Sequence, residues 1–163
     1  MSAVPRTRLR TTRRASHHFV RGALAALVLT TGLSACGGSA EDAYCGVVKD
    51  NQQHLSTVIG DGGSAALIEA LPVFRSLQAK APSDIRKDWD TVVSRLTALQ
   101  EAVTRAGADP KTYDAKHPPA GVTAAQQQAI AAAATAVGSS STVTALNAVQ
   151  QQARDVCHTP LSL

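Results

Sequence analysis

One apolar stripe of helical spacing, near the middle of the chain, constrains the fold more than any other feature. Its members follow one another at intervals of 4, 3, 4, 3 and 4 residues: Ile85, Trp89, Val92, Leu96, Leu99 and Val103. This spacing places all of these side chains on one face of an α-helix, which must pack that face against other elements. Ser83 or Asp84 is predicted to cap the start of this helix, and Gly107 to end it.

Two helical segments are predicted before this stripe. The first is expected from about residue 43 to 59, where apolar residues again recur at helical spacing: Cys45, Val48, Leu55 and Ile59. The sequence GDGG at 60–63 is a strong helix breaker. Ser64 is predicted to cap the second segment, which Pro72 should kink or split into two short helices.

The last third of the chain begins with a loop at 108–122 that contains three prolines. Loops of this length are usually functional or disordered. Thr123 and Gln126 can form a capping box for an alanine-rich helix, which GSSS at 138–141 interrupts. A final helix is expected at about 142–157, with this apolar face: Val143, Leu146, Val149, Ala153 and Val156. Because no stretch alternates in the strand period, the predicted fold class is all-α.

The first 35 residues differ in composition from the rest. They contain six arginines and no acidic residue, and they end in an apolar run at 23–35. This run has the length of a signal-peptide core and is shorter than the roughly 20 apolar residues that a membrane-spanning helix needs. We expect residues 1–35 to be a signal peptide. A buried helix is the alternative, which an arginine-rich start fits poorly.

The apolar run ends in Leu33, Ser34 and Ala35, directly before Cys36. This LSAC sequence resembles the lipobox of bacterial lipoproteins. The resemblance implies cleavage before Cys36 and a diacylglyceryl group on its thiol, and two acyl chains give a stable membrane anchor. The protein would then be exported and held on the outer face of the cytoplasmic membrane; an outer-membrane location is also open. The expected layout is a signal peptide at 1–35, a lipidated flexible tether at 36–43, a helical domain at 44–158 and a short tail at 159–163.

If lipid occupies Cys36, the chain retains two other cysteines, Cys45 and Cys157. Thiols outside the cytoplasm tend to oxidise, so a disulfide between these two is predicted; two buried thiols are the alternative. We expect an antiparallel domain resembling a four-helix bundle, whose fourth arm is interrupted. In up-down-up-down order the first arm starts where the fourth ends, which would place the two cysteines side by side.

Removal of the signal peptide changes the charge of the chain. Six of the 16 Lys and Arg residues lie in it, which leaves ten against 12 Asp and Glu. The remaining domain is therefore mildly acidic and has no cluster of cations interleaved with aromatic residues, so nucleic acid is not an expected partner.

The histidines and carboxylates form no recognisable catalytic or metal-binding motif. His54, His117 and His158 are far apart in sequence, and His54 is expected at the edge of the core. Asp84 and Asp88 are one helical turn apart, as are Arg86 and Asp90. A solvated helix face with local ion pairs is the expected role of these residues, rather than a pair of catalytic acids. No metal, cofactor or catalytic residue is predicted.

One candidate interaction loop stands out, because it places an exposed tyrosine among cations: Lys111, Tyr113, Lys116 and His117. A mobile surface loop is the alternative. The expected function is a non-enzymatic binding or scaffolding module of the cell envelope, anchored to the membrane and facing an envelope protein, a wall component or a small ligand. One alternative is a carrier that encloses an apolar ligand between its helices, near Phe74 and Trp89. A hydrolase built from dispersed residues is the other.

Overall fold

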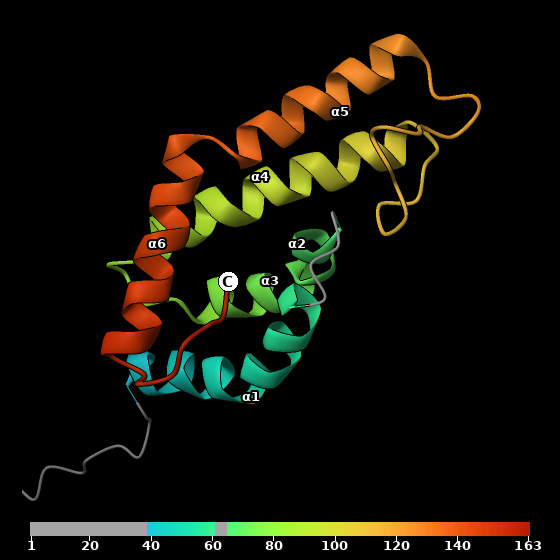
Figure 1. The fold of residues 1–163 in the computed structure, drawn as a ribbon. Helices are drawn as coiled ribbons and strands as arrows, with labels where there is room; N and C mark the ends of the chain where they lie inside the picture. The colour runs from blue at the N-terminus through green and yellow to red at the C-terminus, as the bar shows by residue number, and fades with distance from the viewer. Residues whose placement is uncertain (1–38, 61–64) are drawn as a thin grey trace, which may run out of the picture. The chain divides into compact units, whose positions relative to one another are not determined.

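Six helices make up the regular structure of residues 39–60 and 65–163, which are those that the computed structural model describes (Figure 1). They are α1 (Ala40–Gly60), α2 (Ala66–Glu69), α3 (Leu71–Lys80), α4 (Arg86–Arg105), α5 (Ala124–Val137) and α6 (Ser140–Asp155). These two ranges contain no strand, so the all-α prediction is confirmed for them. The predicted signal peptide, Cys36 and Ser64 lie outside the described residues.

Helix α1 begins at Ala40, earlier than predicted. The Ser39 N–H donates a hydrogen bond to Asp42 Oδ2 (2.9 Å), and the Asp42 N–H donates one to Ser39 Oγ (3.1 Å). This reciprocal pair is a capping box, which occupies N–H groups that otherwise have no partner within the helix. Helix α1 therefore includes residues 40–43, which were predicted to belong to the tether.

Pro72 divides the second helical segment, as predicted. Helix α2 ends at Glu69, and Pro72 lies in the first turn of α3, where its missing N–H removes no helical hydrogen bond. The N-cap of α2 is Ala65, and its side chain makes no capping bond.

Helix α4 starts without a polar cap. Its N-cap is Ile85, with no side-chain hydrogen bond, so the prediction that Ser83 or Asp84 caps it is wrong. The Ile85 side chain is buried, and its N–H donates to the Pro82 carbonyl at 3.3 Å. A tight turn that places an apolar side chain in the core therefore leads into this helix.

Gly107 ends α4, as predicted, with a φ of +76°. Its N–H donates to the Thr104 carbonyl (2.9 Å), and the Ala108 N–H donates to the Val103 carbonyl (3.2 Å). These two bonds form a Schellman motif, which requires a left-handed residue at the glycine position.

The predicted capping box of Thr123 and Gln126 starts α5. Gly138 and Ser139 separate α5 from α6, and the two helices bend by 46°. Among the described helices, none is by itself long and apolar enough to cross a bilayer, whereas α5 and α6 taken together pass that test by length and composition.

The buried face of α6 agrees with the predicted one at Val149 and Ala153 and differs elsewhere. Val143 and Val156 are 46% and 39% exposed, whereas these residues are buried: Thr142, Ala145, Val149 and Ala153. Thr142 Oγ1 donates to the Ala136 carbonyl (2.9 Å) across the break between the helices. This bond satisfies the buried hydroxyl and holds the start of α6 against the end of α5.

Helix α4 is the centre of packing, since it contacts α2, α3, α5 and α6, while α1 contacts α2 and α3. The larger core surrounds Trp89, whose ring lies 5.6 Å from that of Phe74 and whose Nε1–H donates to the Tyr44 hydroxyl (3.2 Å). The predicted disulfide between Cys45 and Cys157 is present, with the two Cα atoms 5.0 Å apart. It joins α1 to the segment after α6.

Candidate functional site

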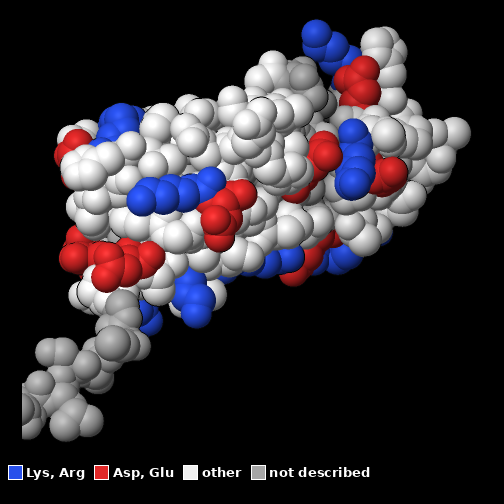
Figure 2. All heavy atoms as spheres, turned by 90° about the horizontal axis from the view of Figure 1, so that it is seen from below, with Lys and Arg blue, Asp and Glu red and all other residues white. Residues whose placement is uncertain are grey.

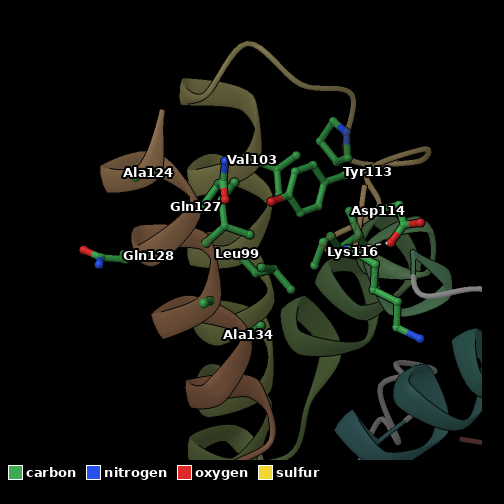
Figure 3. Close-up of a pocket in the computed structure, with 14 residues that line it drawn as sticks. Leu99, Val103, Tyr113, Asp114, Lys116, Ala124, Gln127, Gln128 and Ala134 are labelled. Atoms are coloured by element: carbon green, nitrogen blue, oxygen red, sulfur yellow. Dashed lines mark hydrogen bonds between the residues drawn. The ribbon is translucent and has the colours of Figure 1, made fainter. Parts of the chain in front are cut away.

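A groove of about 670 Å³ lies along the C-terminal part of α4, which is the part further from Trp89. Its walls are the facing sides of α4 and α5, the loop at 108–122, and Ile68 of α2 (Figure 3). It is lined by Ile68, Leu99, Val103, Pro110, Tyr113, Asp114, Ala115, Lys116, Ala124, Gln127, Gln128, Ile130, Ala131 and Ala134. We call this feature the α4–α5 groove.

The groove exists because α5 offers mostly small side chains. Ile130 is its one buried residue, and it packs with Val103 in a second, smaller core that also contains Ala102 and Ala106. The other α5 side chains along the groove are alanines and glutamines, most of them exposed. Alanine lets helices approach closely but fills little volume, so the space above Ile130 stays open.

The loop at 108–122 is held by its own aspartates. Asp109 Oδ1 accepts from the Lys111 N–H (2.9 Å), and Asp114 Oδ1 accepts from the Lys116 N–H (2.8 Å). Asp114 Oδ2 also lies 2.9 Å from His117 Nδ1. The hydrogen bonds from His117 and from the Lys116 backbone hold the pKa of Asp114 below its ordinary value. Such aspartate turns give a proline-rich segment a defined course without a helix.

The four residues of the candidate interaction loop do not all line the same cavity. Tyr113 and Lys116 line the α4–α5 groove, Lys111 borders a smaller cavity of about 220 Å³, and His117 lines neither of these two. Tyr113 is half-buried rather than exposed as expected, with its ring over the groove and its hydroxyl directed toward the side formed by α4 and α5 (Figure 3). The Lys116 stem lines the groove, while its ammonium group points away from Tyr113.

The wall that α5 contributes carries no charge. No Asp, Glu, Lys or Arg occurs between residues 117 and 153, a stretch that includes all of α5 and most of α6. Figure 2 shows acidic and basic side chains interspersed over the face that it presents. The charged members of the groove, Asp114 and Lys116, both belong to the loop. The groove is therefore apolar along the helices and polar at the loop.

The sequence singled out the loop but missed the helical half of the groove. Leu99 and Val103 belong to the predicted packing stripe, and no binding role is predicted for the alanine-rich helix. The available signal was the alanine-rich, uncharged segment at 124–137, which has too few large side chains to cover a neighbouring helix. Periodicity alone cannot reveal that shortage, because alanine counts as apolar.

The remaining candidate residues take structural or solvent-exposed positions. His54 is exposed, so its expected place at the edge of the core is wrong. The expected ion pair of Arg86 and Asp90 is wrong too, because Arg86 bonds to the Ala81 carbonyl (3.0 Å) and Asp90 accepts from Gln78 Nε2 (2.8 Å). Within residues 39–60 and 65–163, no three His, Cys, Asp or Glu side chains lie close enough to hold a metal ion.

The core around Phe74 and Trp89 is closely packed. Both side chains are fully buried, and neither lines the α4–α5 groove or a second cavity, of about 410 Å³, between α1, α2, α6 and the C-terminal Leu163. A ligand between these two rings, as the carrier alternative placed it, therefore has no space there. No family model, curated protein or solved structure matches the chain.

Proposed function

We propose that the protein is a lipid-anchored module of the cell envelope that binds a small apolar ligand in the α4–α5 groove and catalyses no reaction. The observation that carries this proposal is the groove itself. Ligand sites in proteins are typically concave, largely apolar and about 300–1,000 Å³ in volume, with a few polar groups that orient the ligand. The α4–α5 groove has each of these properties.

The lipid anchor is proposed from the LSAC sequence. The position at which α1 begins limits how far the helical domain can lie from that anchor. Three residue steps separate Cys36 from Ser39, the first residue of the α1 capping box. Even fully extended, three steps span only about 11 Å. A diacylglyceryl group on Cys36 would therefore hold the start of α1 close to the membrane surface, rather than on a long tether.

The groove lies far from that anchored end. In Figure 1 the loop at 108–122 and the start of α1 are at opposite ends of the helical unit. Helix α4 runs between these two ends of the unit. Its 20 residues correspond to about 30 Å of helix. An anchored module of this kind would display its groove away from the bilayer, where a ligand outside the membrane can reach it.

The arrangement of the helices fits a four-armed bundle, which we infer as the architecture. Its arms would be α1, the split pair α2 and α3, helix α4, and the bent pair α5 and α6. Consecutive arms contact one another, and the disulfide ties the first arm to the end of the fourth.

A hydrolase is a weaker proposal, because its essential residues do not converge in a cleft. His117 and Asp114 meet at 2.9 Å, but their side chains are 84% and 54% exposed. Within the described residues, no serine, threonine or cysteine side chain bonds to His117. A histidine that activates a nucleophile needs that nucleophile within hydrogen-bond reach.

Native mass spectrometry of the protein extracted from membranes tests the binding proposal. We expect a non-covalent small-molecule adduct on the wild-type protein. The double variant Ala131→Phe/Ala134→Phe should lose it, because both side chains line the groove and both are exposed, so that phenylalanine fills the space without entering the core. The matched control is Ala132→Phe, which changes an exposed alanine of the same helix that does not line the groove. A wild-type protein without an adduct, or an adduct that survives in the double variant, would contradict the proposal.

A further inference from the structure

The size of the α4–α5 groove favours a small molecule over a protein partner. The groove is lined by 14 residues. A standard protein interface takes roughly 20–30 residues from each side. Its volume of about 670 Å³ instead falls within the range of small-molecule sites.

The helical part of the groove is suited to an aliphatic chain. Leu99, Val103 and Ile130 form its floor, and the exposed alanines of α5 form one side. No charged residue lies on this part, so a charged group placed there would lose its hydration without gaining a partner. The helical part therefore selects an apolar chain.

The loop end of the groove is suited to an anionic group. The carboxylates of Asp109 and Asp114 are already occupied by hydrogen bonds from the loop itself. By contrast, the ammonium groups of Lys111 and Lys116 make no ion pair or hydrogen bond within the described residues, and neither does the Tyr113 hydroxyl. Of these, Lys116 and Tyr113 line the groove, whereas Lys111 borders the smaller cavity, so the groups left to meet a ligand in the groove are one cation and one hydroxyl donor.

We propose that the ligand is a single-chain amphiphile with a carboxylate head. Its chain lies along the α4–α5 groove, and its head lies between the helical wall and the loop, where the Tyr113 hydroxyl donates to it and Lys116 compensates its charge. Lys116 reaches the head by turning its flexible, exposed side chain toward the groove. This proposal rests on the proposed function and adds the class of ligand to it.

Photo-crosslinking with three probes tests the proposal. The probes share a C16 chain that carries a diazirine and differ only in the head group, which is a carboxylic acid, an alcohol or an amine. They are applied to the protein in phosphatidylcholine nanodiscs, and labelled peptides are mapped by mass spectrometry. We expect labels on α4 and α5. The acid should label about two- to fivefold more than the alcohol, which is the preference that one solvent-exposed charge pair provides. The amine should label least.

Two sets of variants locate the chain and the head. Ala131→Phe/Ala134→Phe should abolish labelling of α4 and α5, and Ala132→Phe should preserve it. Lys116→Gln should bring the ratio of acid to alcohol labelling close to one, whereas Lys87→Gln, an exposed lysine of α4 that does not line the groove, should leave the ratio unchanged. Circular dichroism confirms that each variant is folded.

The outcomes separate this inference from the proposed function. Equal labelling of the groove by all three probes would overturn the carboxylate head but leave a groove that binds apolar molecules. Labelling that persists in Ala131→Phe/Ala134→Phe would overturn the groove as the site of the chain. If the native adduct depends on the groove but no probe labels it, the amphiphile is overturned while the binding function stands.

Discussion

Tyr44 and Trp89 are both fully buried, and the Trp89 Nε1–H donates a 3.2 Å hydrogen bond to the Tyr44 hydroxyl. Tyr44→Phe removes the acceptor and leaves the Trp89 N–H unpaired in the core. An unpaired buried donor costs about 1–3 kcal/mol, so we expect the free energy of unfolding to fall by that amount in urea titrations. Tyr113→Phe is the matched control and should change it by less than about 0.5 kcal/mol. Equal effects of the two variants would show that this bond does not stabilise the core.

Burial of Tyr44 also predicts a dependence of stability on pH. Desolvation raises the pKa of Tyr44 to about 12, from 10.0. Between these two values the unfolded chain loses the phenol proton while the folded protein keeps it, so stability falls as the pH rises through this window. The free energy of unfolding of Tyr44→Phe should fall less steeply than that of the wild-type protein over the same pH range. Parallel curves for the two proteins would contradict this assignment.

At the scale of the helices, two glycines should respond oppositely to alanine. Gly107 has a φ of +76°, which an L-residue adopts at a cost of about 1–2 kcal/mol, so Gly107→Ala should lower the free energy of unfolding by that amount. Gly46 lies inside α1, and an added Cβ there meets no atom within 4 Å. Gly46→Ala should therefore raise the free energy of unfolding by about 0.5–1 kcal/mol. Thermal or urea unfolding measures the change in the free energy of unfolding for both variants. If both changes have the same sign, the local explanation given for one of the two glycines is wrong.

The sequence predicted these helices better than their ends and faces. Pro72 and Gly107 act through the backbone alone, and both behave as predicted. The start of α4 was wrong because burial of Ile85 outweighs the capping preference of its polar neighbours. The face of α6 was right at Val149 and Ala153 but wrong at its start, where Thr142 is buried because it finds a carbonyl partner across a helix break, which a hydrophobic pattern cannot show. The groove was missed for a related reason: it depends on how the loop at 108–122 is placed beside the two helices.

At the scale of the whole molecule, the disulfide and the proposed anchor lie near the same end of α1. Cys45 is nine residues from Cys36, and its partner Cys157 is 112 residues further along the chain. The pairing could be predicted because cysteine number and helix order both pointed to it. The anchor itself depends on the LSAC sequence and on covalent chemistry at Cys36, and the envelope function depends on the anchor.

Intact mass of the protein extracted from membranes, measured under denaturing conditions before and after reduction and thiol alkylation, tests this central claim most directly. The account predicts a chain that begins at Cys36 and carries a diacylglyceryl group, with two thiols that are alkylated only after reduction. A chain that retains residues 1–35, or a Cys36 thiol that is alkylated without reduction, would contradict the lipid anchor and the envelope function proposed from it.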